Sequence, residues 1–148
     1  MIRYAELKDL NDCTRLAVEF FSPFLEKHGV NVVVNDVYSV AVKTISSHQA
    51  LVVEREGKVC GVTAWAIVPH PANSKIRIFY ETIWCVRSEE PTDTLALLRA
   101  LEDEAVKAKA DMIVVANLSE ENEEQLKRIY TGQGFSFLET HYAKQLGG

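Results

Sequence analysis

The sequence predicts an α/β (α+β) fold in which a mixed central sheet is flanked by about four helices. Stretches with apolar residues at helical spacing are separated by stretches in which apolar residues alternate or run continuously. One strand–helix–strand passage has the form of a crossover, which places two parallel strands in one sheet. The length of 148 residues is that of a typical domain, so residues 1–148 are expected to form a single domain.

The beginning of the chain is expected to form one strand and two helices. Arg3 to Leu7 suits a short strand. Gly29 separates the two helices, and Asn35 or Asp36 is the expected N-cap of the second. Pro23 is expected to kink or end the first helix. The first helix is predicted from one apolar stripe: Cys13, Leu16, Ala17, Phe20, Phe21 and Phe24.

The middle of the chain is expected to contain three strands. Leu51 to Val53 leads through Glu56-Gly57 into Val59 to Val68, a pattern typical of a hairpin. Both alternating sets of residues in the second arm are largely apolar, so this strand should be covered on both faces. A loop over Pro69 to Ser74 then precedes a long strand from Ile76 to Val86.

The last third of the chain alternates helices and strands. Apolar spacing between Leu95 and Ala108 predicts a long amphipathic helix, and Met112 to Ala116 predicts a buried strand. A further helix is expected over Glu120 to Tyr130, with Ser119 as its N-cap. The final strand is expected over Phe135 to Gln145. The predicted order is therefore strand, two helices, three strands, helix, strand, helix, strand.

Composition excludes several classes of function. The net charge of −5 argues against capture of a nucleic acid. No apolar run reaches the ~18 residues that a membrane-spanning helix needs, and Met1 to Asp9 does not resemble a secretory signal. We therefore expect a cytoplasmic protein with no membrane partner. The cysteines and histidines lack metal-ligand spacing, so no metal site is expected, and Cys13, Cys60 and Cys85 are interpreted as reduced core residues.

The order of elements, the stretch from Trp84 to Val115 and the segment Tyr130 to Phe135 together resemble the GNAT superfamily of acyl-CoA-dependent N-acyltransferases. The resemblance spans nearly the whole chain. It implies acetyl-CoA as cosubstrate, with its acyl-pantetheine arm lying between two parted strands. The arm would be bonded to the backbone of Trp84, Cys85 and Val86, and the pyrophosphate would sit on the amides that open the following helix.

The expected pyrophosphate loop departs from the family pattern. The family places Gln or Arg before two glycines, whereas Glu89 to Thr94 stands in register here and contains no glycine. One interpretation is structural, with Pro91 at the first helical position and the acids serving the helix dipole. The other is an altered cradle that uses the amides or hydroxyls of four residues, with Arg87 offsetting charge. The four residues of that cradle are Thr92, Asp93, Thr94 and Leu95.

Two residues match catalytic positions of the family. Glu81 is the candidate general base, because strand alternation places it beside Phe79, Ile83 and Cys85, and burial there would raise its pKa. The alternatives are that Glu81 meets solvent or pairs with a cation. Tyr130 is the candidate general acid that protonates the leaving thiolate. Its alternative role is to pack on Phe135 at the end of a helix.

Asn122 lies near a further family position and is a candidate for cofactor binding, although it is one residue further from Tyr130 than is usual. The leading expectation is transfer of an acetyl group from acetyl-CoA to the primary amine of a small molecule or peptide. The alternative is a GNAT-fold module that has lost catalysis and acts through protein contacts. The sequence specifies neither the acceptor nor an oligomeric state.

Overall fold

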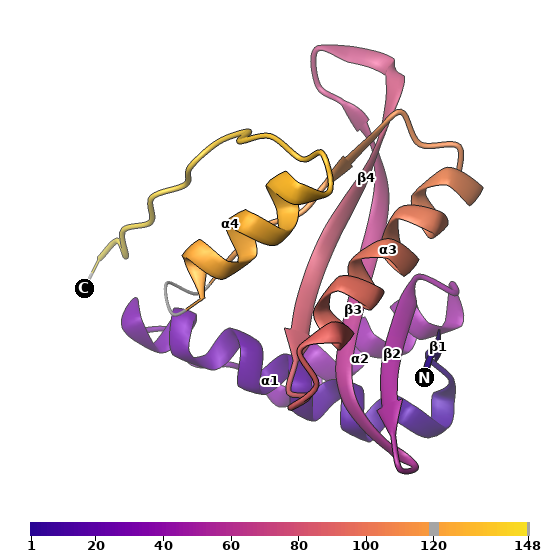
Figure 1. Cartoon of the computed structure of the whole chain (residues 1–148). Coiled ribbons are helices and arrows are strands. Elements are labelled where there is room, and N and C mark those ends of the chain that lie inside the picture. The colour runs from indigo at the N-terminus through magenta and orange to yellow at the C-terminus, as the bar shows by residue number, and fades with distance from the viewer. Residues whose placement is uncertain (119–121, 148) are drawn as a thin grey trace.

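A five-stranded mixed sheet forms the centre of the protein (Figure 1). The structure is a computed structural model and describes residues 1–118 and 122–147. The strands are β1 (Ile2–Tyr4), β2 (Ala50–Arg55), β3 (Lys58–His70), β4 (Asn73–Val86) and β5 (Met112–Val114). They lie side by side in sequence order, and each pair is antiparallel except β4 and β5, which are parallel. This parallel pair confirms the predicted crossover.

Two pairs of helices cover the two faces of the sheet. A short 3₁₀ turn (Leu7–Asp9) leads into the first helix. The helices are α1 (Leu10–Lys27), α2 (Val34–Ser46), α3 (Thr92–Lys107) and α4 (Glu123–Gly132). Helices α1 and α2 pack over one face, where Leu16 and Val52 are fully buried. Helices α3 and α4 pack over the other, where Phe79, Leu97 and Leu98 are fully buried. The central strands are therefore covered on both faces, as the apolar sequence of Val59 to Val68 predicted.

The first two helices differ from the prediction at their ends. Helix α1 continues through Pro23 to Lys27, although proline removes one helical hydrogen bond. Phe20 and Phe21, in the turn before the proline, pack against the core, and this packing keeps the segment helical. Helix α2 begins at Val34, so Asn35 and Asp36 lie in its first turn and neither is the N-cap.

The strand pairing contains an irregularity that changes which side chains share a face. Ala64 pairs with Ile83 and Trp65 pairs with Glu81, so Thr82 is an extra residue in β4. The bulge reverses the alternation beyond it. Ile83 therefore packs with the α1–α2 core, and the expectation that Glu81 shares its face with Ile83 and Cys85 was wrong. Among the apolar residues around Glu81, Phe79 and Trp84 lie in the α3–α4 core.

The predicted final strand does not form. The segment from Phe135 to residue 147 contains no strand, and it extends beyond α4 (Figure 1). Phe137 is 80% exposed and Tyr142 is 95% exposed, because no neighbouring strand pairs with this segment in the described part of the chain. Near the end of the segment, Gln145 lies against Gly29 at the connection between α1 and α2. The predicted N-cap Ser119 and the expected first helical residue Glu120 lie outside the described residues.

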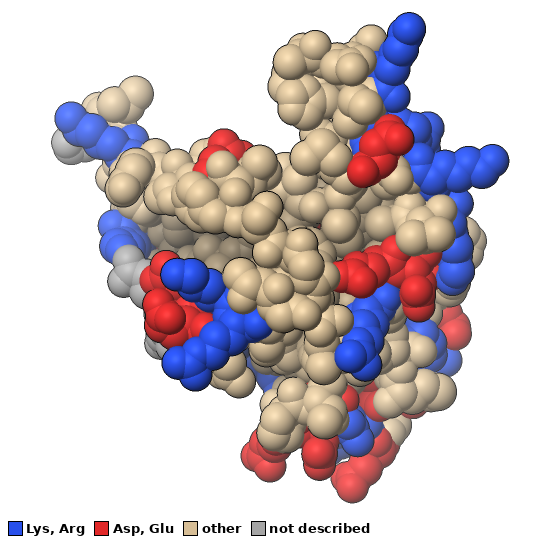
Figure 2. All heavy atoms as spheres, turned by 45° about the horizontal axis from the view of Figure 1, so that its top comes forward, with Lys and Arg blue, Asp and Glu red and all other residues tan. Residues whose placement is uncertain are grey.

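The surface carries charges of both signs. On the face drawn in Figure 2, Lys and Arg side chains lie beside Asp and Glu side chains in several clusters, and a broad region between the clusters carries neither. Within residues 1–118 and 122–147, no helix combines the length and apolarity needed to cross a bilayer. The three cysteines are unpaired, with Cys13 and Cys85 buried and Cys60 partly buried.

Candidate functional site

Strands β4 and β5 part after a short paired stretch. Their pairing covers Ile78 to Tyr80 on β4 and Met112 to Val114 on β5. Beyond Tyr80, β4 continues to Val86 with only β3 as a partner. The other edge of β4 therefore presents backbone groups that no β5 residue pairs with. The bulge at Thr82 lies in this stretch, and the Thr63 hydroxyl donates to the Ile83 carbonyl oxygen (3.0 Å) from the β3 side.

Glu81 stands at the point where the strands part. Its side chain is buried, with the residue 6% exposed. The carboxylate Oε2 accepts the backbone N–H of Ala116, just beyond the end of β5, at 3.1 Å. Burial raises the pKa of Glu81 to about 7, and the Ala116 N–H lowers it in part by bonding to the charged form. Glu81 is therefore a carboxyl group that titrates near neutral pH.

Tyr130 bonds to the backbone of the same residue, Ala116, through the carbonyl group of Ala116. It lies on the last turns of α4, and its hydroxyl donates to the Ala116 carbonyl oxygen at 3.3 Å. Its ring also packs on Phe135, with 5.8 Å between the ring centroids. Burial raises the pKa of the Tyr130 phenol, and the nearby Glu81 carboxylate raises it further. The phenol consequently keeps its proton at neutral pH. Of the two roles expected for Tyr130, the structure shows the packing on Phe135, and the role of general acid stays a prediction.

The remaining β4 candidates divide between the two faces of the sheet. Trp84 and Val86 pack with the α3–α4 core, on the face that carries Tyr130. The Cys85 side chain is buried in the core under α1 and α2, so only its backbone can serve the open edge. Burial raises the pKa of the Cys85 thiol, which keeps it uncharged. These three residues lie on the part of β4 that has left β5 behind.

The start of α3 is organised around a buried carboxylate. Asp93 is 5% exposed, and its two oxygens accept the Arg55 Nε–H (3.0 Å) and Nη2–H (2.5 Å). The Ser88 hydroxyl also donates to the Asp93 carboxylate. Ser88 in turn accepts the Glu90 backbone N–H at 3.1 Å. Arg55 and then Ser88 hold the pKa of Asp93 below its usual range, against the opposing effect of burial. Asp93 therefore stays ionised, and the Arg55 guanidinium offsets its charge.

The other residues expected at this loop differ in availability. The Asp93 backbone N–H is already bonded to the Glu90 carbonyl oxygen at 3.1 Å. Thr92 is exposed, while Thr94 and Leu95 are partly buried in the first turn of α3. Asn122 is the N-cap of α4, and its carbonyl oxygen accepts the Leu126 N–H at 2.9 Å. Asn122 and Tyr130 are separated along α4 by about 12 Å of helix rise, so Asn122 lies apart from the Glu81–Tyr130 group.

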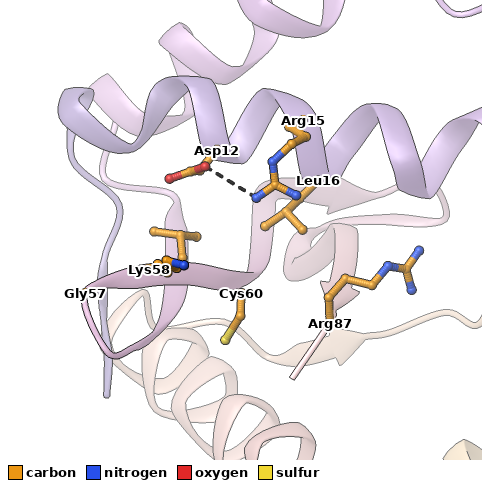
Figure 3. A pocket seen from close by; sticks show the side chains of 8 residues that line it. Asp12, Arg15, Leu16, Gly57, Lys58, Cys60 and Arg87 are labelled. Atoms are coloured by element: carbon orange, nitrogen blue, oxygen red, sulfur yellow. Dashed lines mark hydrogen bonds and ion pairs between the residues drawn. The ribbon is translucent and has the colours of Figure 1, made fainter. Parts of the chain in front are cut away.

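A separate pocket lies on the α1 side of the sheet (Figure 3). Its volume is about 470 Å³, and it opens between α1, the β2–β3 turn and the end of β4. Arg87 lines it, and the Arg87 Nε lies 3.7 Å from Glu19 Oε2. This places the Arg87 side chain with α1. Its backbone N–H is also occupied, by the Cys60 carbonyl oxygen at 2.7 Å.

Three participants were not identified from the sequence. Ala116 contributes only backbone groups, so no residue-type signal marks it. Arg55 is 38 positions from its partner Asp93, and Ser88 is five positions away. The β2–β3 hairpin, which was predicted, brings Arg55 toward the start of α3 and is the one sequence feature that bears on it. The described residues contain no group of three or more side chains suited to hold a metal ion.

Comparisons with solved structures identify the fold. One similar structure is a predicted acetyltransferase with acetyl-CoA from Clostridium acetobutylicum, with 16% identity over 99% of this chain and 96% of that chain and a TM-score of 0.71. Another is AAC(6')-Iy in complex with the bisubstrate analogue CoA-S-monomethyl-acetylneamine, with 12% identity, coverage of 98% and 97%, and a TM-score of 0.73. The chain has the GNAT acetyltransferase fold.

A third GNAT-fold neighbour is a ribosomal-protein-alanine N-acetyltransferase from Brucella melitensis biovar Abortus 2308 (15% identity, 99% of both chains, TM-score 0.69). No family model and no curated protein sequence matches this chain. The likeness is therefore one of fold. In this GNAT fold, Glu81 and Tyr130 meet at Ala116, and Asp93 opens α3 at the far end of the parted strand.

Proposed function

We propose that this chain transfers an acyl group from an acyl-CoA thioester to a primary amine. The observation that carries the proposal is the parting of β4 from β5, with a carboxyl group and a phenol placed at the parting. Glu81 titrates near neutral pH and Tyr130 keeps its proton there, so the two groups have the protonation states that a base and an acid need. Acetyl-CoA is the proposed cosubstrate.

The open edge of β4 suits an extended amide-containing arm. The backbone groups of Trp84, Cys85 and Val86 on that edge have no β5 partner, and an extended ligand can satisfy them as an added strand would. The start of α3 lies at the end of this edge and offers helix-terminal amides to the cosubstrate's phosphates. We assign Thr92, Thr94 and Leu95 to that role. Asn122 is also proposed to bind the cosubstrate, but no contact with Tyr130 supports this assignment.

The chemistry follows from the two side chains. Glu81, when ionised, accepts a proton from the acceptor amine, directly or through a water molecule, so that the nitrogen lone pair can attack the thioester carbonyl. Backbone N–H groups of the β4 edge stabilise the oxygen as it gains negative charge. Tyr130 donates its proton to the sulfur as the carbon–sulfur bond breaks. The nitrogen loses a second proton as the amide forms, and this proton returns Tyr130 to its neutral form. Glu81 releases the first proton to solvent, so the ammonium form of the amine and the thioester give an amide, a free thiol and one proton.

The likeness to solved structures supports both substrates. One GNAT-fold neighbour holds acetyl-CoA, and another holds an analogue that joins CoA to acetylneamine. The third neighbour is described as acting on a ribosomal-protein alanine. These names favour an acetyl donor and an amine acceptor, either a small molecule or a peptide.

A second candidate function is a non-catalytic module that acts through protein contacts. Two observations favour it. The loop from Glu89 to Thr94 contains no glycine, and both Glu81 and Tyr130 are already bonded to backbone groups of Ala116. The exposed apolar side chains of Phe137 and Tyr142 would suit such contacts.

A calorimetric titration with acetyl-CoA and with free CoA at low salt separates the two functions. Saturable binding tighter than ~100 μM, or about −5.5 kcal/mol, followed by amine-dependent release of free thiol, supports the transferase. An absence of both heat and thermal stabilisation at millimolar acetyl-CoA contradicts it and leaves the binding module as the better account. The amine panel should include an aminoglycoside, a polyamine and a peptide with a free N-terminus.

A further inference from the structure

The first turn of α3 carries a negative charge where an anionic ligand is expected to bind. Asp93 is the second residue of the helix, and Glu89 and Glu90 precede it in the connecting loop. An uncompensated carboxylate in this position repels phosphate, and burial of the carboxylate strengthens the repulsion. The loop that carries these carboxylates contains no glycine.

Arg55 is the residue that compensates this charge. It lies at the end of β2, and its Nε–H and Nη2–H bind both oxygens of Asp93 in a bidentate pair. The Arg55 side chain is 45% exposed, whereas that of Asp93 is 7% exposed. The guanidinium therefore faces the carboxylate on one edge and solvent on another. A bidentate pair of this kind offsets the Asp93 charge at the helix terminus.

The same pair fastens the loop. Asp93 accepts the Ser88 hydroxyl, Ser88 accepts the Glu90 N–H, and Glu90 accepts the Asp93 N–H. These bonds close a ring of contacts across residues 88–93. Arg87 and Arg15 do not share this task, because both pair with Glu19 on the α1 side of the sheet.

We propose that Arg55 is a positioning residue of the phosphate-binding site: by holding and neutralising Asp93, it shapes the glycine-free loop and makes it able to accept the pyrophosphate of acyl-CoA. This inference rests on the proposed acyltransferase function.

The test compares a donor that carries phosphates with one that does not. Acetyl-CoA affinity is measured by calorimetry, and turnover of S-acetylpantetheine is measured by thiol release, for the wild type and for Arg55→Met. The variant is expected to bind acetyl-CoA at least about tenfold more weakly, because one charge is left uncompensated. Its kcat/KM for the phosphate-free S-acetylpantetheine should stay within about twofold of the wild type, since no phosphate meets the exposed carboxylate.

Three further variants separate charge from structure. Asp93→Asn in the Arg55→Met background removes the uncompensated carboxylate and should restore most of the lost affinity. Arg55→Lys keeps the charge and should retain more affinity than Arg55→Met. Arg15→Met, which breaks exposed pairs with Asp12 and Glu19, is the matched control and should bind acetyl-CoA as the wild type does.

Each outcome decides the proposal. Unchanged acetyl-CoA affinity in Arg55→Met overturns it while leaving the acyltransferase intact. Equal loss with both donors, or a further loss on adding Asp93→Asn, also overturns it, since that pattern means general structural damage. If the wild type neither binds acetyl-CoA nor turns over either donor, the proposed function fails and this inference fails with it.

Discussion

Two buried carboxylates, Glu81 on β4 and Asp93 at the start of α3, differ in their surroundings. Glu81 is 6% exposed and Asp93 is 5% exposed, and burial acts to raise the pKa of each carboxyl group. Glu81 accepts one backbone N–H, and burial raises its pKa to about 7. Asp93 accepts a guanidinium and a hydroxyl, and its pKa is lowered. The partner therefore decides the charge, since burial alone acts in the same direction on both.

This difference teaches which carboxylate can move a proton. A group whose pKa lies near neutral pH exchanges its proton under working conditions, whereas a salt-bridged carboxylate with a lowered pKa stays ionised. Glu81 is the candidate base for this reason. Asp93, which is paired with Arg55, serves the structure and charge of the loop.

The largest expected effect is that of Glu81→Gln on catalysis. Glutamine keeps an acceptor for the Ala116 N–H but cannot take a proton, so kcat/KM should fall by about 10²-fold or more. In the wild type, kcat/KM should rise as pH passes through about 7, and the variant should lose this limb. Glu104→Gln is the matched control, because Glu104 is a buried carboxylate on α3 bonded to Tyr4 and Lys107. Equal pH profiles for wild type and Glu81→Gln would remove Glu81 from the mechanism.

The second effect is on stability. The folded-state pKa of Glu81 is raised from 4.5 to about 7, so the folded state holds a proton that the unfolded state has lost between these values. Stability should therefore fall as pH rises from 4.5 to 7, by roughly 3 kcal/mol from this residue. Urea denaturation at pH 4.5, 6 and 7.5 should show this slope in the wild type and a flatter one in Glu81→Gln. Parallel slopes in both proteins would mean that the folded-state pKa of Glu81 is that of an ordinary glutamate.

The contrast between these carboxylates was only half visible in the sequence. Glu81 and Tyr130 were recognisable as candidates because they match catalytic positions of the family that the sequence resembles, Glu81 on the strand before the long helix and Tyr130 four residues before Gly134. The residue at which they meet, Ala116, could not be recognised from the sequence, because it contributes backbone atoms alone. The neighbours expected for Glu81 were wrong because one extra residue, Thr82, reverses the strand alternation.

The fold itself was more accessible to prediction than the site. Helical spacing, the Glu56-Gly57 turn and the crossover were enough for the sheet and its helices, because these signals are local. The prediction of a final strand was wrong, because alternation of apolar residues does not supply a partner strand. The Arg55–Asp93 pair depends on tertiary contact between β2 and α3, which no local pattern encodes.

A smaller effect is expected for Tyr130→Phe. The variant removes the proton donor and the 3.3 Å bond to Ala116 but keeps the ring packing on Phe135. We expect kcat to fall about tenfold or more, with a smaller change in KM, because the leaving thiolate loses its acid. Tyr4→Phe also deletes a bonded hydroxyl, the donor to Glu104, and should leave kcat unchanged. A larger loss in Tyr4→Phe than in Tyr130→Phe would contradict the assignment.

The smallest effect is that of Asp93→Asn on stability. The lowered pKa means that the charged carboxylate stabilises the fold above pH 3.8, and that this contribution is lost as pH falls through the folded-state pKa. Because Arg55 is partly solvated, the loss at pH 7 should be only about 1 kcal/mol. Urea denaturation should show the stability difference between wild type and variant shrinking as pH falls below 3.8. A difference that stays constant from pH 7 to pH 3 would mean that the ion pair contributes nothing.

Hydrogen exchange with and without acetyl-CoA tests the central claim most directly. The claim is that the part of β4 beyond Tyr80 and the first turn of α3 receive the cosubstrate, whereas the paired half of β4 does not. Saturating acetyl-CoA should slow exchange at amides from Ile83 to Val86 and from Thr92 to Leu95, with little change over Ile76 to Tyr80. Unchanged exchange at both places, or protection confined to the pocket between α1, the β2–β3 turn and the end of β4, would contradict it.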